Sequence, residues 1–156
     1  MKIVAVGGTF DNLHLGHIQL LSKSFEIGDI TLIGITSDNF AKRKNHEIEP
    51  LKKRENNLKS FLYFYKLANN AKIIILNDPY GPTIDDNEIK IFGIIVSEET
   101  LKRAIDINKV RKNKYLPPLK IFVIPLVKDV DLRPLSSTKL RRGERICEKF
   151  LQDFSR

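Results

Sequence analysis

The sequence predicts an α/β fold: a single Rossmann-like domain, residues 1–156, in which helices cover both faces of a doubly wound parallel five-stranded sheet. Two observations predict it. Segments with strand and helix patterns alternate along the whole chain, which is typical of parallel sheets with right-handed crossovers. A Gly-Gly turn also follows the first apolar run, where such folds bind ligands. We expect the strand order 3-2-1-4-5.

The elements are expected in the following order. Strands are predicted at residues 2–7, 29–36, 71–76, 92–97 and 119–124 from short apolar runs bounded by turn residues. Helices are predicted at residues 14–26, 50–70, 98–114 and 136–154, and Ser37 and Asp38 are expected to cap a further short helix. In the helix at 50–70, Pro50 suits the first turn, and the apolar stripe comprises Leu58, Phe61, Leu62, Tyr65 and Ala68.

Composition narrows the class of protein. The apolar fraction of 42% is that of a folded domain. The net charge of +8 favours an anionic partner, and charge alone does not choose among nucleic acid, an anionic membrane and a polyphosphate substrate. The single cysteine, Cys147, leaves no intramolecular disulfide and fits a reducing cytoplasm. Polar residues interrupt the first apolar run too early for a signal peptide, and no stretch approaches a membrane span, so we expect a cytoplasmic protein with no membrane partner.

The segment Gly-Gly-Thr-Phe-Asp-Asn-Leu-His-Leu-Gly-His follows the first expected strand. Gly7 and Gly8 let the backbone approach a ligand closely, and Thr9 adds a hydroxyl and an amide. His14 and His17 are three residues apart at the start of a helix, so their imidazoles share one face. Free amides and the positive end of the helix dipole lie beside them. Together these features predict an anion site suited to a phosphate chain.

The histidine pair also has two alternative roles. It could bind zinc, but a zinc site needs at least a third ligand, and besides carboxylates the chain offers only His46 and Cys147. The spacing could also be a structural coincidence, with His14 and His17 as surface or capping residues. We therefore expect no protein-bound metal. The segment matches neither the G-x-x-x-x-G-K-S/T loop nor the G-x-G-x-x-G fingerprint, so it indicates a nucleotide site of another kind.

A second group of candidate residues opens the last expected helix. Ser136, Ser137 and Thr138 supply hydroxyls there, and Lys139 and Arg141 follow in its first turns. Such a run is a phosphate cradle, although serine and threonine also simply cap helices. The first site strengthens the hypothesis that this run binds phosphate, because a triphosphate has two ends to hold.

With these motifs the chain resembles the phosphopantetheine adenylyltransferases of the archaeal and eukaryotic type, within the nucleotidyltransferase superfamily marked by His-x-Gly-His. The resemblance covers nearly the whole chain. Its more specific matches are Asp78-Pro-Tyr-Gly-Pro82, Val96-Ser-Glu-Glu-Thr100, Asn108 with Arg111, and Ser136-Ser-Thr-Lys-Leu-Arg141. The bacterial branch differs, with Thr in place of His14 and an Arg-Gly-Leu-Arg run after the fourth strand.

The resemblance implies a reversible reaction in which ATP and 4′-phosphopantetheine give dephospho-coenzyme A and pyrophosphate. It implies that His17 and Lys42 are catalytic, with His17 steadying the transition state. It assigns ATP to Gly8, Thr9, Phe10, His14, His17, Ser136, Ser137, Thr138 and Arg141. It assigns the phosphopantetheine phosphate to Thr9, Lys42, Arg54 and Lys44, and leaves open which of the two lysines makes the contact. Mg²⁺ is expected to be bound through substrate phosphates.

Two competing functions are weighed against this one. An RNA-binding module fits the basic charge, but no RNA-binding signature appears, so we expect no nucleic-acid partner. A sister enzyme, a cytidylyltransferase or a flavin-adenylating enzyme, shares the first motif. The cytidylyltransferase run Arg-Thr-x-Gly-Ile-Ser-Thr-Thr is not matched by Pro134-Leu-Ser-Ser-Thr138. The sequence does not indicate an oligomeric state.

Overall fold

Five strands form one parallel sheet in the part of the chain that the computed structural model describes, residues 1–42 and 47–126. The strands are β1 (Ile3–Gly8), β2 (Ile30–Thr36), β3 (Ala71–Leu76), β4 (Gly93–Ser97) and β5 (Lys120–Ile124). Their spatial order is β3-β2-β1-β4-β5, and every neighbouring pair is parallel. The predicted fold class and strand order are confirmed, with strand ends shifted by at most one residue.

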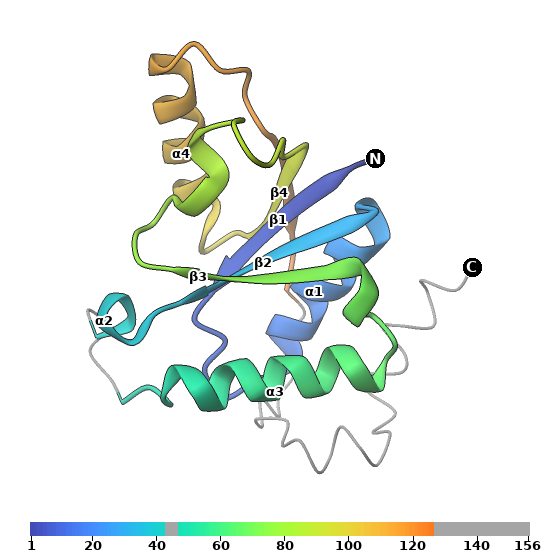
Figure 1. Cartoon of the computed structure of the whole chain (residues 1–156). Helices are drawn as coiled ribbons and strands as arrows, with labels where there is room; N and C mark the ends of the chain where they lie inside the picture. The colour runs from blue at the N-terminus through green and yellow to red at the C-terminus, as the bar shows by residue number, and fades with distance from the viewer. Residues whose placement is uncertain (43–46, 127–156) are drawn as a thin grey trace.

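Helices cover the sheet on both sides (Figure 1). They are α1 (Leu15–Ile27), α2 (Asp38–Ala41), α3 (Leu51–Phe64) and α4 (Leu101–Asn113), with short 3-10 turns η1 (Ala68–Asn70) and η2 (Gly81–Ile84). One core cluster joins the sheet to α1 and α3, through residues such as Ile18, Phe61 and Ile33. A second cluster joins the opposite face to α4, through residues such as Ile107 and Ile94. Each face of the sheet is thus half of a separate hydrophobic core.

Strand β1 is the central strand and the topological switch point of the sheet. It pairs with β2 on one side and with β4 on the other, so the chain crosses over in opposite directions from it. The carboxyl ends of these parallel strands lie at one edge, and ligands of such sheets bind in the crevice outside that edge. The loop that leaves β1 therefore stands where a ligand site is expected.

Helix α3 ends at Phe64, earlier than predicted. The amide of Lys66 bonds to the carbonyl of Tyr63, and the amide of Leu67 bonds to the carbonyl of Leu62. This is the Schellman pattern, with Lys66 in the left-handed region at φ 58°. The prediction of one helix over residues 50–70 was wrong because the apolar stripe continues past the end, and because this cap holds a lysine where glycine is usual.

Two other helix starts differ in detail from the prediction. Helix α4 begins at Leu101 because Thr100 first closes a turn on Ser97, its amide bonding to the Ser97 carbonyl. In α2, the Ser37 hydroxyl accepts from the amide of Phe40 and is the cap, as predicted, whereas Asp38 turns its carboxylate to α3. The predicted helix at 136–154 lies outside the described residues. Within the described ranges, no helix is long and apolar enough to cross a bilayer.

We expect Lys66→Gly to stabilise the protein. An L-residue in the left-handed region costs roughly 1–2 kcal/mol, and part of that gain is offset by the larger unfolded-state entropy of glycine, leaving about 0.5–1 kcal/mol. Urea unfolding measures the difference. The control is Lys59→Gly, an exposed position inside α3, where glycine should instead destabilise by about 1 kcal/mol. Equal destabilisation by both changes would contradict the capping role.

Candidate active site

Two histidines cap the N-terminus of α1 reciprocally. The amide of Gly16 donates to Nδ1 of His14 at 3.1 Å, and the amide of His14 donates to Nδ1 of His17 at 3.2 Å. This is the geometry of a capping box, built with imidazoles in place of a hydroxyl and a carboxylate. The sequence led us to expect free amides at this helix start. Instead, the amides of His14 and Gly16 are occupied by the two rings.

The capping bonds decide which ring nitrogen carries the proton. A neutral imidazole whose Nδ1 accepts a hydrogen bond carries its proton on Nε2, so Nε2 is the donor atom of each ring. Burial lowers the pKa of His14 below its ordinary value of 6.5, although the Asp11 carboxylate opposes part of this shift. The rings of His14 and His17 stack with centroids 3.8 Å apart. His14 is therefore a neutral donor at pH 7.

The stacked rings explain the glycine between the histidines. A Cβ atom placed on Gly16 would lie 3.0 Å from Cε1 and 3.2 Å from Nδ1 of His14. A side chain there would require the His14 ring to shift by a few tenths of an ångström from the position in which it caps the helix. The glycine in His-x-Gly-His thus suits the tight packing of the capping box.

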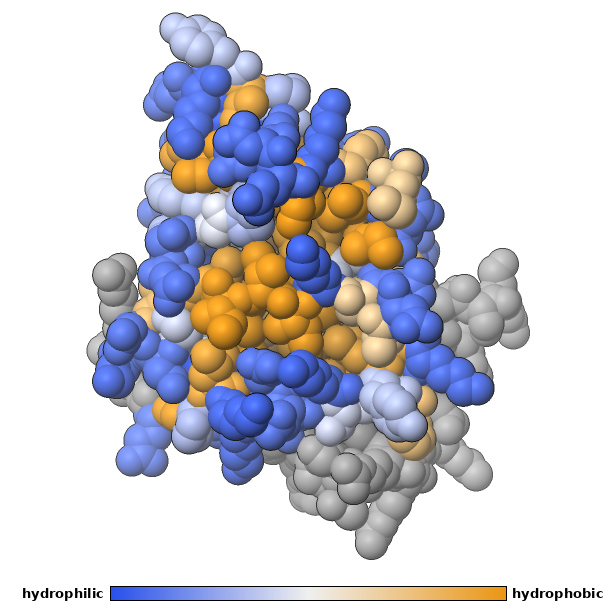
Figure 2. Space-filling view, in the orientation of Figure 1, coloured by the Kyte–Doolittle hydropathy of each residue, from blue (hydrophilic) through white to orange (hydrophobic). Residues whose placement is uncertain are grey.

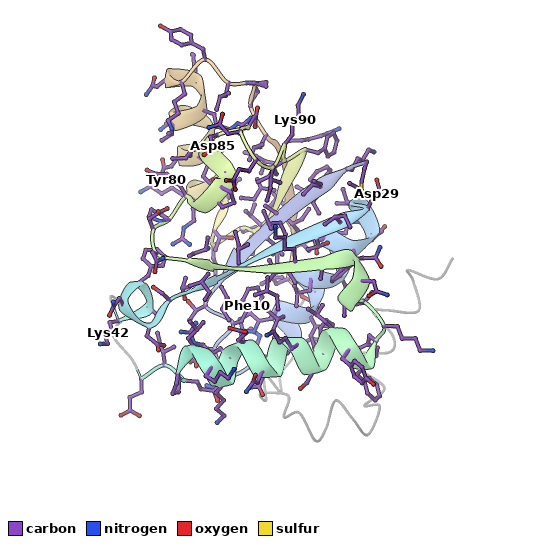
Figure 3. The ribbon with its side chains drawn as sticks, in the orientation of Figure 1. Phe10, Asp29, Lys42, Tyr80, Asp85 and Lys90 are labelled. Carbon is purple, nitrogen blue, oxygen red and sulfur yellow. The ribbon has the colours of Figure 1, made fainter. Side chains whose placement is uncertain are left out.

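The loop between β1 and α1 is strained at two residues. Phe10 has φ 52° and Asn12 has φ 45°, values that residues other than glycine rarely adopt. The ring of Phe10, labelled in Figure 3, is buried in the core below the loop and lies 5.3 Å from the ring of His17. Burying the ring anchors the loop, and it leaves the backbone of the loop, not the Phe10 ring, on the ligand side.

A cavity of about 520 Å³ opens beside this loop, within the size range of small-molecule sites. Its wall combines the loop after β1, the start of α1 and the end of β4, including Gly8, Thr9, Asp11, His14, His17 and Thr100. Thr9 is itself buried, and the histidines are half-buried. The structure therefore gathers the predicted residues Gly8, Thr9, Phe10, His14 and His17 at one cavity, and their binding of ATP stays a prediction.

The remaining predicted site residues fall into three groups. Lys42 is exposed at the end of α2, on the carboxyl side of the sheet (Figure 3), and lies outside the cavity wall. Arg54 is completely buried, and all three nitrogens of its guanidinium bond to protein acceptors. Lys44, Ser136, Ser137, Thr138 and Arg141 lie outside the described residues, so their roles remain predictions.

Sequence reasoning did not place Ser97 and Thr100 in the site, although both line the cavity. Ser97 ends β4 and is 4% exposed, and the Thr100 hydroxyl accepts from its amide at 3.1 Å. A signal existed in the sequence. Because β4 was expected beside β1, hydroxyls directly after β4 should meet the loop after β1 at the same edge of the sheet.

A second cavity lies on the other side of the β1 end and is apolar. Its wall includes Leu32, Leu76, Tyr80 and Val96, and it shares Gly7 and Thr100 with the first cavity. Hydrophobic residues also gather on the surface between α3 and α4, over β3 (Figure 2). A polar pocket with imidazole donors thus adjoins an apolar one, along the edge where α/β sheets bind nucleotides.

This fold and site define the protein as a nucleotide-binding α/β protein with a His-x-Gly-His helix start. The family model described as cytidylyltransferase-like matches residues 5–143. A phosphopantetheine adenylyltransferase of Methanopyrus kandleri is 42% identical over 139 residues, which are 88% of this chain and 87% of that protein. One from Methanothermobacter thermautotrophicus is also 42% identical, over 92% of this chain and 85% of that protein.

Solved structures agree on the fold. A protein of unknown function from Archaeoglobus fulgidus superposes with a TM-score of 0.72 at 28% identity, covering 87% of this chain and all of that one. A putative nicotinate-nucleotide adenylyltransferase from Vibrio parahaemolyticus gives a TM-score of 0.59 at 16% identity, over 96% of this chain and 97% of that one, a likeness of fold alone. The chain belongs to the cytidylyltransferase-like nucleotidyltransferases and, within them, to the phosphopantetheine adenylyltransferase family.

The lowered pKa of His14 makes stability depend on pH. Because the folded pKa lies below the unfolded value of 6.5, the contribution is fully present above pH 6.5 and is lost as the pH falls through the folded pKa. We expect His14→Asn to keep the cap, since Asn is a good N-cap residue, and to remove this dependence. Urea unfolding between about pH 7.5 and 5.5 should show a steeper loss for the wild type. Parallel pH profiles would contradict the assignment.

Proposed function

We propose that the protein transfers the adenylyl group of ATP to 4′-phosphopantetheine, giving dephospho-coenzyme A and pyrophosphate in coenzyme A biosynthesis. The observation that carries this proposal is the pair of imidazoles fixed at the start of α1, which line one cavity together with Thr9. That arrangement suits a phosphate chain, and the names of the relatives supply the substrates. We place the reaction in the cytoplasm, with no nucleic-acid or membrane partner.

The reaction depends on positioning the two substrates more than on acid–base catalysis. A phosphate monoester is largely ionised at pH 7, so an oxygen of phosphopantetheine can attack the α-phosphorus of ATP without a general base. The new P–O bond forms as the bond between the α-phosphorus and the bridging oxygen to the β-phosphorus breaks, and pyrophosphate leaves with that electron pair. Holding the two substrates in line can supply roughly 7–11 kcal/mol of the barrier.

In this scheme His17 and His14 donate from Nε2 to the triphosphate, with His17 nearer the α-phosphate as charge builds on it. Such a donor is worth about 3 kcal/mol when it is aimed at the transition state. Thr9 contacts both the ATP phosphates and the phosphate of phosphopantetheine. Either Lys42 or Lys44 contacts the phosphopantetheine phosphate, and the β- and γ-phosphates are held by Ser136, Ser137, Thr138 and Arg141.

The residues around the cavity fit Mg²⁺ that arrives on the substrate phosphates. Among the described residues, no group of three His, Cys, Asp or Glu side chains could form a cage for the ion. Mg²⁺ keeps several waters and commonly rests on phosphate oxygens, and it neutralises their charge when bound. Asp11 lines the cavity, but one oxygen of its carboxylate already accepts from the amide of Glu49 at 2.8 Å.

The apolar cavity adjoins the phosphate cavity at Gly7 and Thr100 and lies between Leu76, Tyr80 and Val96. Its volume of about 50 Å³ is below the usual size of a small-molecule site and is too small for the pantetheine arm. The choice of phosphopantetheine over the substrates of sister enzymes therefore rests on the relatives, which are named phosphopantetheine adenylyltransferases.

We expect the purified full chain to form dephospho-coenzyme A from ATP, Mg²⁺ and 4′-phosphopantetheine, detected by mass spectrometry with pyrophosphate release. Chelation of Mg²⁺ should abolish turnover, because the triphosphate charge then opposes the incoming dianion. Pantetheine without its phosphate is the matched control and should give no product, since it lacks the attacking oxygen. Turnover that is equal with CTP, or pyrophosphate release that does not need phosphopantetheine, would exclude the proposal.

A further inference from the structure

Arg54 is one of two arginines that lie inside the described part of the protein, and it is the one beside the loop after β1. It is 0% exposed. Its Nε donates to the carbonyl of Glu49 at 2.7 Å, and its Nη2 donates to the carboxylate of Asp38 at 3.0 Å. Its Nη1 donates to the carbonyls of Thr36 at 2.7 Å and Thr9 at 3.0 Å. A buried charge is tolerated only with such partners, so these bonds define its environment.

The acceptors of Arg54 come from both walls of the proposed reaction site. The carbonyl of Thr9 belongs to the loop after β1, which leads to His14 and His17. Thr36 ends β2, and Asp38 begins the short helix α2, which ends before Lys42. The planar guanidinium therefore fixes the distance between the phosphate loop and the segment that carries the lysine.

A second set of bonds from the same region holds the strained loop. The carboxylate of Glu49 accepts from the amide of Asn12 at 2.9 Å, and the amide of Glu49 donates to the carboxylate of Asp11 at 2.8 Å. Burial alone would raise the pKa of Glu49, but hydrogen bonds from Lys53 and from Asn12 outweigh it, so the pKa is lowered and the carboxylate stays ionised. Strained residues persist when surrounding contacts over-determine them, and here those contacts come from Glu49, two residues before α3 begins.

We propose that Arg54 is a positioning residue for adenylyl transfer: it joins the Thr9 loop to the β2–α2 segment and touches neither substrate. This rests on the proposed function, and it replaces the direct contact with the phosphopantetheine phosphate that sequence resemblance implied for Arg54. A guanidinium with no exposed surface, and with every nitrogen bonded to protein, reaches a substrate only if those bonds break. Misplacement of reacting groups by about 1 Å can lower the rate about a hundredfold. Loss of the Arg54 hydrogen bonds should therefore lower kcat.

The structure supplies a matched control for this inference. Arg111 is also buried, and it donates to the carbonyls of Pro117 and Thr83 and to the carboxylate of Asp86. It anchors η2 on the opposite face of the sheet, away from the loop after β1. Lysine at either position keeps the charge but cannot span the same acceptors, so both Arg54→Lys and Arg111→Lys should lower the melting temperature.

The test compares kcat, both KM values and hydrogen–deuterium exchange in the full-length wild type and the two variants. We expect Arg54→Lys to lower kcat about tenfold or more at saturating substrates and to speed exchange of the amides of residues 9–12. Arg111→Lys should lower kcat far less. Any other kinetic change in this variant should fall on KM for phosphopantetheine. If Arg54→Lys does not fold, Asp38→Asn removes one acceptor charge and should lower kcat about threefold, with a smaller change in exchange.

Three results would overturn the inference. Equal kcat losses in Arg54→Lys and Arg111→Lys would reduce Arg54 to general stability, and so would unchanged exchange in residues 9–12. A rise in KM for phosphopantetheine at unchanged kcat would make Arg54 a direct ligand. Wild-type protein that binds ATP but transfers nothing to phosphopantetheine would overturn the proposed function itself, before any variant is compared.

Discussion

The site depends on the two bonds that cap α1, in which Nδ1 of His14 accepts from the amide of Gly16 and Nδ1 of His17 accepts from the amide of His14. In capping the helix, these bonds assign the ring protons to the Nε2 atoms of two histidines that line the cavity. A capping box usually contributes helix stability through residues with no other task. Here the same two bonds cap the start of the helix and hold the imidazole donors. Because the His14 ring packs against Gly16, a side chain on Gly16 would move that ring.

Around this helix start, the protein holds an unfavourable loop in place with buried polar contacts. Phe10 and Asn12 are strained. The ring of Phe10 anchors the loop from the core, while Arg54 of α3 and Glu49, which precedes α3, hold the loop's backbone. The arrangement resembles a preorganised site, in which folding energy fixes backbone groups before the substrate arrives. The two buried arginines hold different segments. Arg54 bonds to the Thr9 loop, and Arg111 bonds to η2 beside the apolar cavity.

The sheet, its strand order and the histidine loop could be predicted from the sequence, because apolar periodicity and the Gly-Gly turn are local signals. The end of α3 could not, since Lys66 occupies a left-handed position that glycine normally marks, and the apolar stripe runs on to Tyr65. The burial of Arg54 could not be predicted either. Its acceptors lie 5 to 45 residues away in the sequence, and an arginine early in a helix looks like a surface or ligand-binding residue until those carbonyls are brought together.

The most direct test of this account is the ¹⁵N spectrum of the histidine imidazoles in the full-length protein at about pH 7.5, assigned with single-histidine variants. We expect both His14 and His17 to be Nε2–H tautomers, because each Nδ1 accepts a backbone amide, and we expect ATP with Mg²⁺ to shift both Nε2 signals. An Nδ1–H tautomer at either residue, or Nε2 signals that ATP leaves unchanged, would contradict the claim that this helix start is built to present two donors to a phosphate chain.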